Sequence, residues 1–185
     1  MGDKVGAVVL LPFLMVVILI VFIPQLVLYG RIFFIQERPG LQGEIFKLYK
    51  LQTMKQGEGK DKERMTLFGG LLRKTGIDEL PQIINILKGE MSFVGPRPLL
   101  SEYLALYNDN HKKRHNVLPG ITGLTQVNGD KISSWKDKLD FDLEYVNSIS
   151  FYTDLKIIVS TIKLLLFKAG KEKEFIEGKF TGYEY

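Results

Sequence analysis

Two adjacent carboxylates and one arginine are the side chains in this sequence best placed to do chemistry. Asp78 and Glu79 come just before a short apolar stretch, 83–88, that predicts a helix ending at Gly89. Carboxylates are favoured at the positive N-terminal end of a helix. A short extended run then leads to the turn Gly95-Pro96-Arg97-Pro98, which holds Arg97 on stiff backbone. This pattern indicates a site for an anionic substrate.

An acidic pair before a helix is also ordinary capping, so Asp78 and Glu79 alone do not establish a site. The turn adds weight, because it requires proline and glycine but has no structural need of Arg97. Two further cations extend the hypothesis. Lys50 falls on the apolar face of a predicted strand, 45–51, where an anionic partner would explain it, although an edge lysine that reaches solvent fits equally well. Arg73 lies five residues before Asp78, at the end of a predicted apolar helical stripe.

The elements that position these residues begin with an apolar N-terminus. Val5 to Tyr29 contains no ionisable side chain except Tyr29, and as a helix it would be about 37 Å long, enough to cross a hydrocarbon core of about 30 Å. The 185 residues are one domain's worth, and the absence of cysteine excludes disulfides and thiolate metal sites. The net charge of +4 gives little reason to expect nucleic acid, since no motif interleaves basic and aromatic residues.

Three interpretations compete for the apolar run. A signal peptide is disfavoured, because the run is long and no small-residue cleavage site follows it. A single membrane-spanning helix is the default from composition. A re-entrant helix, which dips into the membrane and returns, needs a break at Pro12 or Pro24.

The rest of the chain predicts short strands and helices. Residues 31–54 read as two strands around a turn, and 55–64 as a polar loop. Residues 99–114 read as a helix ending in a basic run, 111–115, that is either solvated or in contact with lipid headgroups. Ser134 and Asp137 predict a capping box, and an amphipathic helix is expected over about 153–168, either packed on the core or in the membrane interface. The glycine-rich stretch 117–129 allows close backbone approach to a ligand but carries no nucleotide fingerprint.

Three motifs resemble the bacterial sugar transferase family, the small monotopic phosphoglycosyl transferases. They are DELPQ at 78–82, GEMSFVGPRP at 89–98 and PGITGLTQVNG at 119–129, and the resemblance covers roughly 33–167. It implies an α+β fold: a re-entrant membrane helix over 1–30, a small cytoplasmic catalytic domain of helices with short strands over 31–170, and amphipathic interfacial helices. A charged tail is expected over 171–185.

The resemblance also implies an activity. Asp78 would form a covalent phosphosugar intermediate from a UDP-sugar and release UMP, and polyprenol phosphate would then take the phosphosugar. Glu79 would bind Mg²⁺, while Lys50, Arg73 and Arg97 would bind phosphates. The enzyme would act on the cytoplasmic face of the bacterial inner membrane, in contact with phospholipid and with downstream glycosyltransferases as further partners.

Three positions depart from the family pattern, because Gln52, Leu118 and Asp130 stand where basic residues are expected. These losses support an alternative, a catalytically impaired relative that serves as a membrane-anchored scaffold or nucleotide-sugar sensor. The intact Asp78, Glu79 and the three cations favour the enzyme. The sequence does not identify the sugar.

Overall fold

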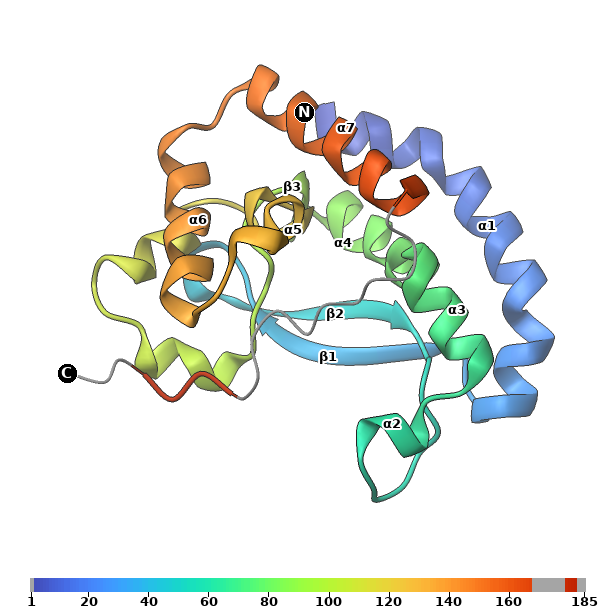
Figure 1. Ribbon diagram of the computed structural model, residues 1–185. Coiled ribbons are helices and arrows are strands. Elements are labelled where there is room, and N and C mark those ends of the chain that lie inside the picture. Colours follow the sequence, from blue (N-terminus) through green and yellow to red (C-terminus); the bar gives the residue numbers. More distant parts are fainter. Residues whose placement is uncertain (1, 168–178, 183–185) are drawn as a thin grey trace. The chain divides into compact units, whose positions relative to one another are not determined.

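The computed structural model describes residues 2–167 and 179–182 and contains both helices and short strands, which confirms the predicted α+β class (Figure 1). The helices are α1 (Gly2–Tyr29), α2 (Asp61–Arg64), α3 (Leu67–Thr75), α4 (Ile83–Lys88), α5 (Leu124–Val127), α6 (Trp135–Asn147) and α7 (Phe151–Phe167). The strands are β1 (Phe33–Pro39), β2 (Ile45–Leu51), β3 (Ser92–Val94) and β4 (Gly120–Thr122). Five 3₁₀ helices complete the order: η1 (Leu41–Gly43), η2 (Ile77–Gln82), η3 (Ser101–Leu106), η4 (His111–Asn116) and η5 (Gly129–Lys131).

The chain forms two compact units. Unit 1 comprises Met1–Gln36 and Leu48–Gly89, and unit 2 comprises Glu37–Lys47 and Glu90–Tyr185. Strands β1 and β2 pair as the predicted hairpin, and the division between the units falls within both strands.

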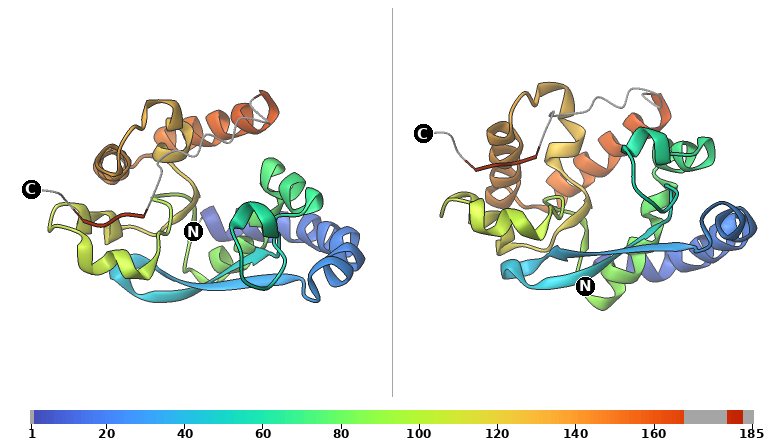
Figure 2. Two further views of the ribbon diagram at one scale, coloured as in Figure 1. Left: turned by 60° about the horizontal axis from the view of Figure 1, so that its bottom comes forward. Right: turned by 90° about the horizontal axis from the view of Figure 1, so that it is seen from below.

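Unit 1 is built around one face of α1. Val17 and Val21 pack with Leu51 and Leu72 in a buried apolar cluster. At the end of the helix, the Tyr29 hydroxyl donates to the Thr53 carbonyl oxygen at 3.2 Å. Figures 1 and 2 show α4 beside α1, and the two helices contact each other directly. The apolar run predicted from the sequence is thus partly core and not only a membrane segment.

Helix α1 is continuous through Pro12 and Pro24. Among the residues that the structure describes, it is the one helix long and apolar enough to cross a membrane. Its outward face carries exposed apolar side chains from Val5 to Val27.

Gly69 lets α3 approach its neighbours closely. A Cβ atom at this position would come within 1.9 Å of the Thr53 carbonyl oxygen and 2.9 Å of the Tyr29 hydroxyl. Because backbone atoms cannot give way so far, any side chain here would push α3 from the strand end and from α1.

Unit 2 is organised around a two-stranded parallel sheet. Strand β3 pairs with β4 in the register Ser92↔Gly120 and Val94↔Thr122, and α7 packs against both strands. A Cβ atom at Gly120 would lie 2.1 Å from the Gly95 nitrogen, so this glycine is required by the approach of two backbones within the protein.

Several predicted elements are confirmed and two differ from the prediction. Ser134 and Asp137 form the expected capping box at the start of α6, and Gly89 ends α4 in the left-handed conformation with φ 82°. The single helix predicted over 99–114 is replaced by η3 and η4, and four residues of the predicted loop form α2. The predicted tail, 171–185, lies outside the described residues except for 179–182, where Phe180 packs on Tyr103.

Candidate functional site

The carboxylate pair lies in unit 1, at the start of a helical stretch made of η2 and α4. Helix α3 ends at Gly76, whose φ of 69° turns the chain into η2 and puts Asp78 and Glu79 in its first turn. The side chains of adjacent residues in such a turn point in different directions. Asp78 is 7% exposed and Glu79 is more accessible, so the two carboxylates have different surroundings.

Lys50 binds Glu79, so of the two interpretations that the strand pattern left open, the anionic partner is the one observed. The Lys50 Nζ donates to Glu79 Oε1 at 2.6 Å, and the two side chains are 20% and 18% exposed. Strand β2 explains the geometry, because Phe46 and Leu48 are buried on the face that Lys50 shares. Strand β2 therefore places the Lys50 ammonium group beside the acidic turn.

Arg73 is positioned in the same unit by the last turn of α3. Its Nε donates to Thr53 Oγ1 at 2.9 Å, which ties the guanidinium to the segment following β2. Four of the five predicted site residues thus belong to unit 1, on strand β2, helix α3 and turn η2.

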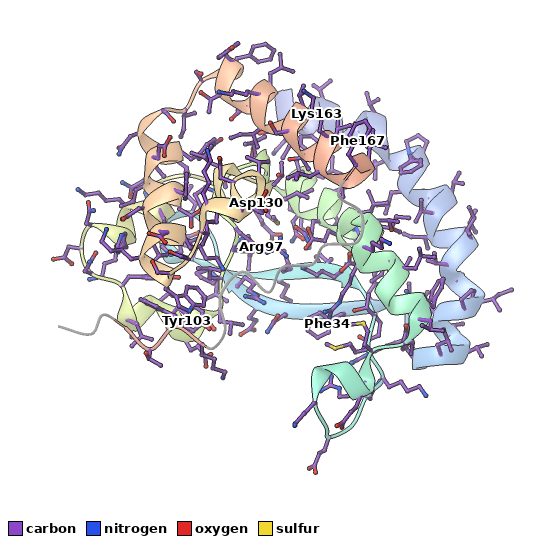
Figure 3. The ribbon with its side chains drawn as sticks, viewed as in Figure 1. Phe34, Arg97, Tyr103, Asp130, Lys163 and Phe167 are labelled. Carbon is purple, nitrogen blue, oxygen red and sulfur yellow. The ribbon has the colours of Figure 1, made fainter. Side chains whose placement is uncertain are left out.

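Arg97 belongs to unit 2 and follows β3, in the predicted Gly-Pro-Arg-Pro turn (Figure 3). Its carbonyl oxygen accepts a hydrogen bond of 2.6 Å from Arg114 Nη2. Arg114 also donates to Asp142 Oδ2 from Nε at 3.0 Å and from Nη2 at 2.7 Å, and both side chains are 2% exposed. Thr125 Oγ1 donates to the other oxygen of Asp142 at 2.6 Å. A buried ion pair on η4 and α6 therefore holds the backbone of the arginine turn.

The sequence reasoning missed Arg114, because it assigned the whole basic run 111–115 to solvent. That interpretation is wrong for three of the five residues, since His111, Arg114 and His115 are buried. The spacing of three residues places His111 and Arg114 on one side of η4, and this spacing was the signal available in the sequence.

His115 is held neutral in this buried layer. Its Nδ1 donates to the Gly40 carbonyl oxygen at 3.0 Å. Burial lowers the pKa of His115 to about 4, and the neighbouring Arg114 charge adds to the effect, while the bond to Gly40 and the charge of Asp142 oppose it.

The three positions that depart from the expected basic pattern lie in different surroundings. Gln52 is 4% exposed and donates to the Met54 carbonyl oxygen, so its side chain belongs to the interior of unit 1. Leu118 is half-buried, and Asp130 is exposed on η5 (Figure 3). A basic residue at position 52 would have to bury a charge there.

The described residues contain no group of three or more acidic or histidine side chains arranged to hold a metal ion. The donors available at the acidic turn are carboxylate oxygens, which Mg²⁺ prefers, and Glu79 already accepts from Lys50. Such a set fits Mg²⁺ only where phosphate oxygens of a substrate complete the coordination.

The sequence is similar to a family of known proteins over most of its length. The family model described as bacterial sugar transferase matches residues 1–168. A Bacillus subtilis (strain 168) protein named uncharacterized sugar transferase EpsL is 43% identical over 189 residues, covering 97% of this chain and 94% of that protein. A Xanthomonas campestris pv. campestris protein named UDP-glucose:undecaprenyl-phosphate glucose-1-phosphate transferase is 39% identical, covering 71% of this chain but 31% of that protein. The exopolysaccharide production protein ExoY of Rhizobium meliloti (strain 1021) is 34% identical, covering 76% and 73%.

Proposed function

Because the chain belongs to the bacterial sugar transferase family, we propose that it transfers a phosphosugar from a UDP-sugar to polyprenol phosphate through an intermediate on Asp78. The observation that carries the proposal is the acidic turn of η2, where the buried Asp78 stands next to a Glu79 already bound to a cation. Relatives named as UDP-glucose:undecaprenyl-phosphate glucose-1-phosphate transferases support the reaction class.

The reaction has two displacements at one phosphorus atom. A carboxylate oxygen of Asp78 attacks the phosphorus that bears the sugar, the bond to the bridging oxygen breaks, and UMP leaves with that oxygen and its electron pair. A phosphate oxygen of polyprenol phosphate then attacks the same phosphorus. The acyl phosphate bond breaks, the Asp78 carboxylate is regenerated, and the product is a polyprenol diphosphate-linked sugar.

The cations of the site serve the leaving group. Lys50, Arg73 and Arg97 would bind phosphate oxygens, and a guanidinium fork suits this task because it makes two parallel hydrogen bonds. When a phosphate binds, Lys50 would leave the Glu79 carboxylate and donate to a phosphate oxygen instead. Glu79 would then be available to bind a metal cation.

Glu79, with phosphate oxygens of the donor, would hold Mg²⁺. When bound there, Mg²⁺ supplies positive charge that neutralises the diphosphate and stabilises the departing UMP. The described residues offer few ligands for a metal here, which suits Mg²⁺ because substrate oxygens can supply its remaining ligands.

The membrane would be the site of action, because polyprenol phosphate resides in the bilayer. Both ends of helix α1 contact the rest of unit 1: Lys4 Nζ lies 3.5 Å from the position of a Cβ atom at Gly89, and the Tyr29 hydroxyl donates to the Thr53 carbonyl oxygen. A helix covered by protein at both ends supports a shallow arrangement with the acidic turn facing the cytoplasm, whereas the break at Pro12 or Pro24 that a re-entrant helix needs is not seen in α1. A perpendicular span would carry polar parts of unit 1 into lipid.

This arrangement has a direct test, because the chain has no cysteine. Single cysteines at position 2 and at Gly57 would be treated with a membrane-impermeant maleimide in whole cells. Neither should be labelled until the inner membrane is opened. Labelling of position 2 alone in intact cells would establish a true span.

The proposed chemistry is tested by intact-mass spectrometry of the protein with Mg²⁺ and a panel of UDP-sugars, without acceptor. We expect a mass increase equal to one phosphosugar, located at Asp78 by peptide mapping, together with UMP in solution. An adduct on another residue, or UMP release without any adduct, would contradict the intermediate.

The alternative of a binding-only scaffold was motivated by the three changed positions. Gln52 is explained by its place in the interior of unit 1, so its identity gives no support for lost catalysis. The alternative then rests on Leu118, which is half-buried, and Asp130, which is exposed.

A further inference from the structure

We propose that Tyr29 and Thr53 are positioning residues for Arg73, and that together they hold its guanidinium group in place for a phosphate of the nucleotide donor. The sequence gave no role to either residue. Tyr29 is the last residue of α1, so the long apolar helix would serve the site as well as the core of unit 1. The identity of the phosphate rests on the proposed function, whereas the contacts that hold Arg73 do not.

The guanidinium group of Arg73 is held from one side. Its Nε donates to Thr53 Oγ1 at 2.9 Å, and Thr53 is 5% exposed. Among the side chains that the structure describes, none makes a hydrogen bond to the two terminal nitrogens of this half-buried arginine. The terminal nitrogens can therefore donate two parallel hydrogen bonds to one phosphate, while the bond to Thr53 limits the rotation of the group.

Tyr29 holds the main chain of the same threonine. Its ring is 5% exposed, and its hydroxyl donates to the Thr53 carbonyl oxygen at 3.2 Å. Thr53 thus accepts from α1 with its carbonyl oxygen and from α3 with its hydroxyl oxygen. A change in the position of Thr53 would move the acceptor on which Arg73 depends.

The Tyr29 hydroxyl also reaches the start of α3, the helix that carries Arg73 in its last turn. It is hydrogen-bonded to Thr66 Oγ1, and Thr66 is the N-cap of α3, where it accepts from the Gly69 nitrogen at 2.9 Å. Because Tyr29 has a single proton, which goes to Thr53, the hydroxyl of Thr66 must donate to Tyr29. One hydroxyl group therefore fixes both supports of Arg73, the start of its helix and the acceptor of its side chain.

Packing keeps the three elements from moving independently. A Cβ atom at Gly69 would lie 1.9 Å from the Thr53 carbonyl oxygen and 2.9 Å from the Tyr29 hydroxyl, so α3 is in close contact with both. The apolar cluster that contains Leu51 and Leu72 joins β2 and α3 to the inner face of α1. The position of Arg73 is therefore set by the end of α1.

A simpler explanation is that Tyr29 only satisfies buried polar groups. The segment has other supports, because the Gln52 nitrogen donates to the Ile32 carbonyl oxygen at 2.9 Å and the Lys55 nitrogen donates to the Arg64 carbonyl oxygen at 2.9 Å. These backbone bonds should keep the segment folded without the Tyr29 hydroxyl. A purely structural Tyr29 would affect stability, but its effect on ligand binding would not depend on Arg73.

The test uses the full chain in nanodiscs of neutral phosphatidylcholine with Mg²⁺, and UDP as the probe in isothermal calorimetry. Arg73→Gln should weaken UDP by about tenfold or more, the loss of a charge-assisted hydrogen bond. Tyr29→Phe and Thr53→Val should each weaken it by about fivefold, the value of one ordinary hydrogen bond. Thr53→Ser keeps the hydroxyl and should bind UDP within about twofold of the wild type.

A double-mutant cycle shows whether Tyr29 acts through Arg73. Tyr29→Phe added to Arg73→Gln should cost no further affinity, because the side chain that it positions is already absent. Additive losses would overturn the proposal, since Tyr29 would then act independently of Arg73. It would equally be overturned by unchanged affinity in both Tyr29→Phe and Thr53→Val, by unchanged affinity in Arg73→Gln, or by a wild type that does not bind UDP.

Two variants of unit 1 are matched controls. Tyr49→Phe removes the hydroxyl of a tyrosine whose partner is the Lys88 ammonium group, at 2.9 Å. Thr75→Val removes a hydroxyl two residues after Arg73, where it donates to the Leu71 and Leu72 carbonyl oxygens of its own helix. Both should bind UDP within about twofold of the wild type. Losses equal to those of Tyr29→Phe and Thr53→Val would show that any lost hydroxyl has this effect and would overturn the specific role.

The outcome is separable from that of the proposed function. An adduct on Asp78 combined with unaltered UDP binding in Tyr29→Phe and Thr53→Val would disprove the positioning role alone. Weakened UDP binding in these variants, without any adduct on wild-type Asp78, would disprove the intermediate alone.

Discussion

The ion pair at the acidic turn of unit 1 and the ion pair at the arginine turn of unit 2 differ in their exposure to solvent. In unit 1 the Lys50–Glu79 pair is part-exposed, with 20% and 18% of the two side chains accessible. In unit 2 the Arg114–Asp142 pair is 2% exposed on both sides and serves a backbone carbonyl. An accessible pair can exchange partners when substrate arrives, whereas a buried pair fixes geometry. The accessible pair of unit 1 is therefore suited to substrate binding, whereas the buried pair of unit 2 stabilises the backbone of the turn.

The largest effect is expected at Asp78. Asp78→Asn is nearly isosteric but is a poor nucleophile, so turnover measured as UMP release should fall on the order of 10³-fold or more. The fold, followed by circular dichroism and thermal unfolding, should be retained. Substantial turnover in the Asn variant would place the nucleophile elsewhere, and the acidic turn of unit 1 would then have no catalytic role.

Arg97→Lys should lower kcat/KM by about 10²-fold although the positive charge is kept, because an ammonium cannot reproduce the planar fork. Steady-state kinetics with the UDP-sugar measures this loss. Near-normal kcat/KM would show that Arg97 serves only to form the turn. The arginine turn of unit 2 would then make no contribution to catalysis.

The two ion pairs should differ in what they do for stability. Asp142→Asn leaves the buried Arg114 uncompensated and should lower the free energy of unfolding by about 3–5 kcal/mol. Lys50→Met, at the part-exposed pair, should change it by about 1 kcal/mol or less. Chemical denaturation in detergent, followed by Trp135 fluorescence and circular dichroism, gives both values.

Asp109→Asn is the control for this pair of variants, because the Asp109 side chain is 98% exposed and its partner Lys112 is also at the surface. Its stability should equal that of the wild type. Similar losses in Asp142→Asn and Lys50→Met would erase the distinction between the two regions.

Acid should weaken unit 2 through His115. The folded pKa of about 4 lies below the ordinary value of 6.5, so the unfolded chain binds more protons between these values and stability falls as pH drops from about 6.5 to 4. The shift corresponds to a loss of at most about 3 kcal/mol. Arg114 and Asp142 face the ring and are common to the wild type and the variant.

His115→Gln keeps an amide donor for the Gly40 carbonyl oxygen and does not titrate. Its thermal unfolding temperature should depend less on pH over this range than that of the wild type. Parallel profiles for the two proteins would show that another group governs the acid response.

Local patterns predicted most of the elements. The alternation of Phe46, Leu48 and Lys50 predicted strand β2, and Ser134 with Asp137 predicted the start of α6. These features depend on neighbours in the sequence, so they can be read from it directly.

The helix predicted over 99–114 was wrong because side chains there compete with the helical backbone. Asn108 Oδ1 accepts from the His111 backbone nitrogen at 2.8 Å, which starts η4 and separates it from η3. The role of Arg114 was missed for another reason, since its partners Asp142 and the Arg97 carbonyl are 28 and 17 residues away in sequence. Contacts of this kind are set by the fold and carry no local signature.

Helix α1 has a consequence for biogenesis. It leaves the ribosome before the rest of unit 1, and the residues that cover Val17 and Val21 include Leu51 and Leu72, which are synthesised later. Until they emerge, the face of α1 destined for the protein interior has only lipid or a chaperone to cover it, and Gln25, fully buried in the finished structure, lies on that face. Under the proposed membrane location, insertion of α1 and folding of unit 1 are therefore one coupled event, and deleting the first 29 residues removes part of the core of unit 1.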